Sequence, residues 1–321
     1  MSTEPIVVIT RRIPGELHIP GATVSHGPDE LLPRERTLVR IRGASIVVTM
    51  FSDRVDADFL DAAGPQLKGV CNFAVGVDNF DLAECARRGV VVANTPHAVT
   101  EGTADLAWTL ILAAARRLPA ADRYARSPEY PARGPLGMAE FLGQDLTGRT
   151  LLIVGAGRIG YATALRSLGW GMRVLYVARS RHWDFELAPL AASRVDLEEG
   201  LREADVVSLH TPLTPDTRHL INARRLAIMK PNAILVNTAR GPVIDEAALV
   251  DALRNGRIWG AGLDVFEHEP QVHPGLLTLD NVALAPHIGS AAARYREMMT
   301  QMVQENAVAI LQGRRPPFAV G

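Results

Sequence analysis

Three side chains suited to acid–base and anion-binding chemistry follow separate apolar runs late in the chain. They are Arg240 in NTARGPVIDE, Glu269 in AGLDVFEHEP and His287 in NVALAPHIGS. An imidazole can give up a proton near neutral pH, and a carboxylate on its other ring nitrogen would orient it. A guanidinium presents a planar fork that binds a carboxylate and polarises a neighbouring carbonyl. Together they predict reduction of a carbonyl that lies beside a carboxylate.

A glycine-rich turn, VGAGRIG (154–160), predicts a nucleotide-phosphate site. It follows an apolar run and opens a helical pattern. The first glycine allows the sharp turn, the second lets the backbone approach a pyrophosphate, and the third lets helix and strand pack tightly. The free N–H groups at the start of the helix favour the anion. The predicted site comprises Gly155, Gly157, Arg158, Ile159 and Gly160.

The next strand-like run, VLYVARSRH (174–182), ends in a basic tip. Ala178 stands where an acidic residue usually binds the adenosine ribose of NAD. Its absence removes the repulsion of a 2′-phosphate, and Arg179, Ser180 and Arg181 offer donors to one. We therefore expect NADP(H) as the preferred coenzyme and NAD(H) as the alternative. The competing interpretation is a solvated basic turn.

Short β-branched runs alternate with helical patterns along the chain, which predicts parallel α/β sheets. A long helix is expected over 100–118, an irregular segment over 127–137, and a last helix from Ser290 to about Leu311. The expected strands cover 5–10, 22–26, 45–50, 69–75, 89–94, 149–155, 172–178, 204–210, 233–239, 260–266 and 281–287.

Composition excludes several classes of function. The 321 residues carry a net charge of −1, which gives no basic field for nucleic acid or a membrane surface. No apolar run is long enough to span a bilayer, and the N-terminus does not read as a signal peptide. Two cysteines, Cys71 and Cys85, favour a reduced, cytoplasmic compartment. His268 and His273 flank Glu269 without metal-ligand spacing, so no metal is expected.

The chain resembles the D-isomer-specific 2-hydroxyacid dehydrogenases, and among them the glyoxylate/hydroxypyruvate reductases. The resemblance covers nearly the whole length. The matching segments are NFAVGVDNFDLAECARRGVVVANTP, VGAGRIG, LHTPLTPDTRHLIN, NTARGPVIDEAALVDAL, GAGLDVFEHEP and APHIGS.

The resemblance implies an α/β fold of two doubly wound parallel-sheet domains. A Rossmann NAD(P)-binding domain would span 99–289, and a discontinuous flavodoxin-like substrate domain would span 1–98 plus 290–321. It implies an NAD(P)-dependent dehydrogenase, a homodimer, that reduces small 2-oxo acids such as glyoxylate and hydroxypyruvate to D-2-hydroxy acids. Its partner would be a small-molecule acid.

The same resemblance implies the site. Arg240, Glu269 and His287 would be catalytic, and Met50, Val75, Gly76 and Arg240 would bind substrate. Beyond the glycine turn and the basic tip, the coenzyme would contact Thr103, His210, Thr211, Pro212, Thr217, Ala239, Asp264, His287 and Ser290.

One departure leaves the substrate open. Related reductases carry tryptophans before the GxDLxGKT motif, whereas GPLGMAEFLGQDLTGRT (134–150) has none. Leu136, Met138 and Phe141 are the available substitutes. A phosphoglycerate, phosphite or other D-2-hydroxyacid dehydrogenase is thus an alternative, as is a non-catalytic, nucleotide-responsive binding protein like the corepressors that share this fold.

Overall fold

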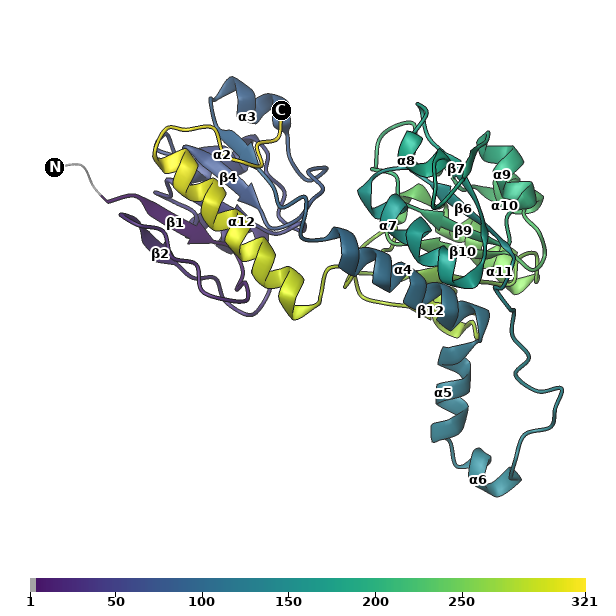
Figure 1. Ribbon diagram of the computed structural model, residues 1–321. Coiled ribbons are helices and arrows are strands. Elements are labelled where there is room, and N and C mark those ends of the chain that lie inside the picture. Colours follow the sequence, from purple (N-terminus) through teal and green to yellow (C-terminus); the bar gives the residue numbers. More distant parts are fainter. Residues whose placement is uncertain (1–3) are drawn as a thin grey trace. The chain divides into compact units, whose positions relative to one another are not determined.

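The computed structural model describes residues 4–321, which divide into two compact units (Figure 1). The first unit comprises residues 4–102 and 290–321, and the second comprises 103–289. The expected boundary lay at 98/99. In the structure it falls at 102/103, inside the helix α4 (Thr100–Ala115).

The first unit is built on a five-stranded, wholly parallel sheet in the order β2-β1-β3-β4-β5. All strands except the edge strand β2 are mainly buried and apolar, as expected where helices cover both faces of a parallel sheet. Its strands are β1 (Ile6–Ile9), β2 (Thr23–Ser25), β3 (Ile46–Thr49), β4 (Gly69–Asn72) and β5 (Val91–Ala93), and its helices are α1 (Arg34–Arg40), α2 (Ala57–Ala63), α3 (Leu82–Arg87) and α12 (Ala293–Leu311).

The C-terminal helix α12 closes this unit, although it is remote in sequence from the sheet. It lies so near β4 that a Cβ at Gly69 would meet the Ile310 side chain at 2.8 Å. The buried Asn306 donates to the carbonyl of Asn94 at 3.0 Å and accepts from the amide of Phe318 at 3.1 Å. The discontinuous unit is therefore fastened by specific polar contacts as well as by packing.

The second unit contains a seven-stranded parallel sheet in the order β12-β11-β10-β9-β6-β7-β8. The order reverses at the β6/β9 junction, where doubly wound sheets bind ligands. Its strands are β6 (Thr150–Val154), β7 (Arg173–Val177), β8 (Ser193–Arg194), β9 (Val206–Leu209), β10 (Ile234–Asn237), β11 (Gly260–Leu263) and β12 (Val282–Leu284).

Both faces of this sheet are packed. In β6, Leu152 and Val154 enter one apolar cluster, while Leu151 and Ile153 enter the other. The covering elements are α4, α7 (Arg158–Arg166), η1 (Ser167–Trp170), α8 (Trp183–Glu186), α9 (Leu197–Glu203), α10 (Ala223–Ile228), η2 (Gly241–Val243), α11 (Glu246–Arg254) and η3 (Leu276–Thr278).

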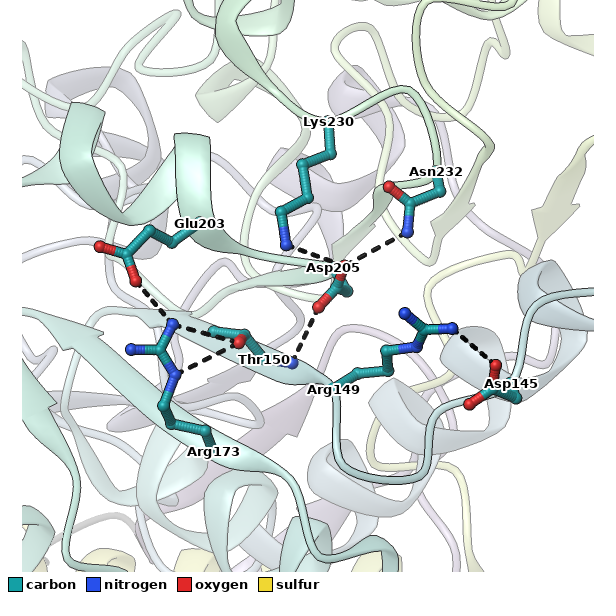
Figure 2. Close-up of polar contacts among 8 residues, drawn as sticks. All are labelled: Asp145, Arg149, Thr150, Arg173, Glu203, Asp205, Lys230 and Asn232. Atoms are coloured by element: carbon teal, nitrogen blue, oxygen red, sulfur yellow. Dashed lines mark hydrogen bonds and ion pairs between the residues drawn. The ribbon is translucent and has the colours of Figure 1, made fainter.

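A polar network ties together the amino-terminal ends of four of these strands (Figure 2). Asp205 accepts from the Thr150 amide at 3.0 Å, from the Lys230 ammonium at 3.0 Å and from the Asn232 side chain at 3.2 Å. Burial alone would raise the pKa of Asp205, but these hydrogen bonds outweigh it and the pKa is lowered. The carboxylate is thus a stabilising ion at the edge opposite the strand ends that carry the predicted chemistry.

All eleven strands expected from the sequence are confirmed, each somewhat shorter than its apolar run. Two expectations are wrong. The segment 127–137 is not wholly irregular, because it contains α6 (Glu129–Arg133). The expected 100–118 helix breaks at Arg117, whose φ of 50° is left-handed, and α5 (Leu118–Arg126) starts anew. The strand β8 was not predicted.

Candidate active site

His287 follows β12 and is held on both its backbone and its ring. Its Nδ1 lies 2.8 Å from Oε2 of Glu269, while Oε1 of Glu269 accepts from the Phe266 amide at 3.0 Å. Both side chains are about three-quarters buried, with exposed fractions of 24% and 27%. Since Glu269 binds Nδ1, proton exchange with a ligand is assigned to Nε2.

The backbone of His287 adopts a left-handed φ of 55°, which is uncommon outside glycine. Asp264, which follows β11, holds it there. The Asp264 carbonyl accepts from the His287 amide at 2.8 Å, and its carboxylate accepts from the amides of Ile288 at 2.7 Å and Gly289 at 2.9 Å. Burial raises the pKa of Asp264 to about 6, against the lowering effect of these amide donors.

Arg240 lies in the turn that follows β10. The fully buried Asn237 builds this turn, accepting from the Ala239 amide at 3.0 Å and donating to the Arg240 carbonyl at 2.9 Å. Because Asn237 fixes the main chain on both sides of the turn, the half-buried Arg240 starts from a defined backbone position. It donates from Nη1 to the Ala239 carbonyl at 2.8 Å.

Two buried glutamates join the Arg240 turn to the segment that carries Glu269. The Glu267 amide donates to Glu246 at 2.7 Å, and the Glu246 amide donates to Glu267 at 3.3 Å. His219 adds a contact of 2.5 Å to the Glu267 carboxylate. Gly241 packs so tightly here that a Cβ would lie 1.9 Å from the Phe266 carbonyl group. The sequence reasoning missed these residues, since isolated glutamates read as solvated.

Arg240, Glu269 and His287 are therefore brought to the same edge of one sheet. They follow β10, β11 and β12, which are adjacent and parallel. A proton-donating imidazole with a carboxylate partner and a positioned guanidinium can together bind and protonate an anionic carbonyl compound.

The glycine turn matches the needs of a dinucleotide pyrophosphate. Gly155 has a φ of 105°, and a Cβ there would meet the His210 backbone at 2.7 Å. A Cβ at Gly160 would lie 2.2 Å from the Gly155 carbonyl oxygen. At Gly157, the N-cap of α7, a Cβ would meet nothing within 4 Å. Gly155 and Gly160 are thus required by packing, whereas Gly157 leaves room for a ligand.

Two orphaned hydroxyls also fit a nucleotide coenzyme. Among residues 4–321, the buried Oγ1 atoms of Thr211 and Thr238 have no hydrogen-bond partner. They follow β9 and β10, at the same edge as the glycine turn. A buried hydroxyl without a hydrogen-bond partner costs free energy, which a bound ligand can recover by supplying the partner. Thr211 was predicted, and Thr238 was missed beside the predicted Ala239.

Other predicted coenzyme contacts have local roles in the structure. Burial lowers the pKa of His210 to about 3, so its ring is neutral beside Ser208 at 2.9 Å. The Thr217 hydroxyl donates to the Pro212 carbonyl at 2.6 Å and fixes the turn after β9. Thr103 lies on α4 beside Gly289. A Cβ added at Gly289 would lie 3.2 Å from the Thr103 Oγ1. Ser290 is the first residue of the returning first-unit segment.

The basic tip, residues 178–181 after β7, is partly as expected. Arg179 and Ser180 are exposed, whereas Arg181 forms an ion pair with Glu186 at 2.5 Å and lies over the Trp183 ring at 4.2 Å. A third arginine, Arg194 of β8, donates to the tip carbonyls. It was missed because it comes from a strand that the sequence did not predict.

The predicted substrate residues Met50, Val75 and Gly76 belong to the first unit. Asn94 donates to the Val75 carbonyl at 2.8 Å, and Asn72 donates to the Gly76 carbonyl at 2.7 Å. Within residues 4–321 the amides of Val75 and Gly76 have no partner, so they can donate to a carboxylate. The Met50 amide donates to Asp53 at 2.8 Å, and its carbonyl accepts from the Asp53 amide at 3.0 Å and from Asn79 at 3.3 Å, which leaves Met50 its side chain for ligand contact.

No group of three His, Cys, Asp or Glu side chains within residues 4–321 could hold a metal ion. No helix in this range is long and apolar enough to cross a membrane.

Comparison with known proteins agrees with this geometry. The model of the D-isomer specific 2-hydroxyacid dehydrogenase, NAD binding domain, matches residues 108–289. A glyoxylate reductase of Thermococcus onnurineus is 50% identical over 99% of this chain and 96% of its own. A Thermus thermophilus crystal structure superposes with a TM-score of 0.91 at 44% identity, covering 98% of this chain and 100% of its own.

A second solved structure carries a coenzyme. It is the NADPH-dependent glyoxylate/hydroxypyruvate reductase of Sinorhizobium meliloti in complex with NADP and malonate. It has a TM-score of 0.85 at 32% identity and covers 99% of this chain and 97% of its own. Fold and site thus define a nicotinamide-dependent oxidoreductase of two α/β units. The chain belongs to the D-isomer specific 2-hydroxyacid dehydrogenase family.

Proposed function

We propose that this enzyme reduces glyoxylate and hydroxypyruvate to the corresponding 2-hydroxy acids, of D configuration where C2 is chiral, with NADPH as the preferred coenzyme. The observation that carries the proposal is the 2.8 Å contact between His287 and Glu269 beside the Arg240 turn. The names of the similar reductases from Thermococcus onnurineus and Sinorhizobium meliloti support the substrate class.

The residues of the proposed active site divide the reaction among them. The guanidinium of Arg240 binds the substrate carboxylate. Bound NADPH supplies the hydride for the carbonyl carbon. His287 gives a proton from Nε2 to the carbonyl oxygen, and Glu269 stabilises the imidazolium and fixes its tautomer. The buried Asp264 keeps the His287 backbone in place and contributes to nicotinamide binding.

Coenzyme preference rests on the tip of β7. Ala178 carries no carboxylate that would repel a 2′-phosphate, and exposed Arg179 and Ser180 supply donors to one. NAD(H) serves as the weaker alternative. Parallel assays with NADPH and NADH at equal concentration measure this preference directly.

The test is turnover on a panel of 2-oxo acids, followed by two variants. We expect His287→Ala and Arg240→Ala to lower kcat/KM for glyoxylate by at least about a hundredfold, the range reported for positioned acid–base groups. NADPH binding, followed by its fluorescence, should persist in both. His18→Ala, an exposed histidine of the first unit, is the matched control. An active variant of either residue, or faster turnover of a bulky acid, phosphoglycerate or phosphite, would overturn the assignment.

The proposed assembly is a homodimer formed through the α5–α6 segment. Figure 1 shows α5 and α6 projecting from the sheet of the second unit. This segment and the loop that follows it expose Leu118 (57%), Met138 (93%) and Leu142 (62%), apolar surface that a second copy can cover. Light scattering on the purified chain should give twice its mass of 34.7 kDa. The buried thiols Cys71 and Cys85 support the proposed cytoplasmic location.

A further inference from the structure

Arg194 is the side chain that shapes the tip of β7. Its Nε and Nη2 donate to the Ala178 carbonyl at 3.1 and 2.9 Å, and Nη2 also donates to the Arg179 carbonyl at 3.0 Å. Both carbonyl oxygens are thereby bound on the β8 side. The Arg194 guanidinium therefore neutralises the partial negative charges of these two carbonyl oxygens, which would otherwise repel an anion bound at the tip.

The tip is joined directly to the glycine turn. The Gly155 amide donates to the Val177 carbonyl at 3.0 Å, at the last residue of β7. β8 pairs in parallel with β7, with Arg194 opposite Tyr176. A guanidinium at the end of β8 therefore lies at the same strand edge as the pyrophosphate site, where the adenosine ribose of a coenzyme is expected.

Arg181, the other arginine of the tip, is committed elsewhere. Glu186 binds it at 2.5 Å, and the same carboxylate accepts from the Tyr176 hydroxyl at 2.7 Å. Those two donors hold the pKa of Glu186 below its usual range, so the pair stays ionised at neutral pH. Trp183 stacks beneath the Arg181 guanidinium. In residues 4–321, neither Arg179 nor Arg194 pairs with a carboxylate.

We propose that Arg194 is the positioning residue of the adenosine 2′-phosphate site, and that this site consists of Arg179, Ser180 and Arg194 rather than of Arg179 and Arg181. The proposal rests on the NADPH preference proposed above. Arg194 fixes the main chain of the tip, aims Arg179 and the Ser180 hydroxyl outward, and adds a positive charge. The fork of an arginine is needed for this, because a lysine ammonium cannot bind both carbonyls in one fixed plane.

Calorimetric binding of two fragments tests the proposal without turnover. Adenosine 2′,5′-bisphosphate carries the 2′-phosphate, and adenosine 5′-monophosphate lacks it. We expect Arg194→Gln to raise Kd for the bisphosphate at least tenfold and to change Kd for the monophosphate less than twofold. Arg194→Lys should recover less than half of the lost affinity on a logarithmic scale, and Arg181→Gln should raise the bisphosphate Kd less than twofold. Arg202→Gln, at an exposed position of α9, is the control.

The outcomes separate this inference from the proposed function. A wild-type protein that binds both fragments equally would overturn the NADPH preference and the Arg194 site together. A wild-type protein that favours the bisphosphate, with Arg194→Gln unchanged, would overturn the Arg194 site alone. Full recovery in Arg194→Lys would exclude the positioning role, and a loss in Arg181→Gln equal to that in Arg194→Gln would exclude the proposed composition.

Discussion

Replacing Asp264 by Asn separates the two effects of this buried carboxylate. The carboxylate accepts from the amides of Ile288 and Gly289 and so holds His287 in its left-handed conformation. An asparagine of the same shape can accept only one of these bonds and turns an N–H toward the other amide. The variant therefore mimics the protonated acid.

The magnitude follows from the pKa of Asp264, which is raised from 3.8 to about 6 by burial. Each pH unit between the two values is worth about 1.4 kcal/mol, so ionising Asp264 costs the folded protein about 3 kcal/mol. Between about pH 4 and pH 6 the folded state binds more protons than the unfolded chain, so stability falls as pH rises through this window. The nearest charged groups, His287 and Glu269, shift this pKa in opposite directions.

The ionised Asp264 costs stability, but catalysis depends on it. A left-handed residue costs about 1–2 kcal/mol, and a hydrogen bond to a charged group is worth about 1.5–3 kcal/mol. Losing one of the two bonds removes most of the surplus that holds the strained backbone. Small displacements of a reacting group can cost about a hundredfold in rate, so we expect kcat of Asp264→Asn to fall at least about tenfold.

Tryptophan fluorescence during urea unfolding is the suitable assay. All 4 tryptophans of the chain, at positions 108, 170, 183 and 259, lie in the second unit and report on it alone. The wild-type protein should lose about 3 kcal/mol of stability between pH 4 and pH 7 that the variant does not lose. A variant that keeps the same pH dependence, or whose kcat stays within twofold of wild type, would refute this account of Asp264.

Two further substitutions test the packing of the second unit. Gly241→Ala places a methyl group 1.9 Å from the Phe266 carbonyl. It should destabilise the unit by about 1–3 kcal/mol and raise KM for the oxo acid. Urea unfolding measures the first effect and steady-state kinetics the second, and an unchanged value in either assay would contradict the prediction. Asp205→Ala leaves the buried Thr150 amide unpaired, whereas the partly exposed Lys230 ammonium can be hydrated by water, which should cost about 1–3 kcal/mol without altering kcat at 20 °C. Because the pKa of Asp205 is lowered, its contribution should fade as pH drops below the usual carboxylate range, so the stability of Asp205→Ala should approach that of wild type in acid. A destabilisation by Asp205→Ala that is as large in acid as at neutral pH would contradict that.

The sequence predicted the strands well because buried parallel strands are continuous β-branched runs. The strand β8 escaped because it consists of two residues, Ser193 and Arg194, which are polar and exposed. The α6 helix, with the sequence EYPAR, escaped because proline and the flanking glycines are typical of loops. Short elements defined by their neighbours carry too little local signal to be recognised.

The candidate site shows the same division. Arg240, Glu269 and His287 could be predicted because each follows a recognisable strand, and parallel strands bring their carboxyl ends together. The Glu246–Glu267 contact could not be predicted, since it depends on which turns meet in space. Arg194 was hidden for a similar reason: it acts on Ala178 from 16 residues further along the chain.

Asp205 and Asp264, two of the buried carboxylates of the second unit, show how one sheet can combine stability with a strained site. Asp205 lies at the amino-terminal edge and receives a lysine ammonium and two N–H donors, so its pKa is lowered and its charge stabilises the fold. Asp264 lies at the carboxyl edge and receives backbone amides without a cation of comparable strength, so its pKa is raised and its charge costs stability. A carboxylate is nevertheless needed there, because a neutral side chain cannot accept both amides that hold the backbone around His287. The folding free energy lost at the carboxyl edge, at Asp264, is therefore tied to catalysis. The amino-terminal edge, at Asp205, is remote from the ligands and can be optimised for folding alone.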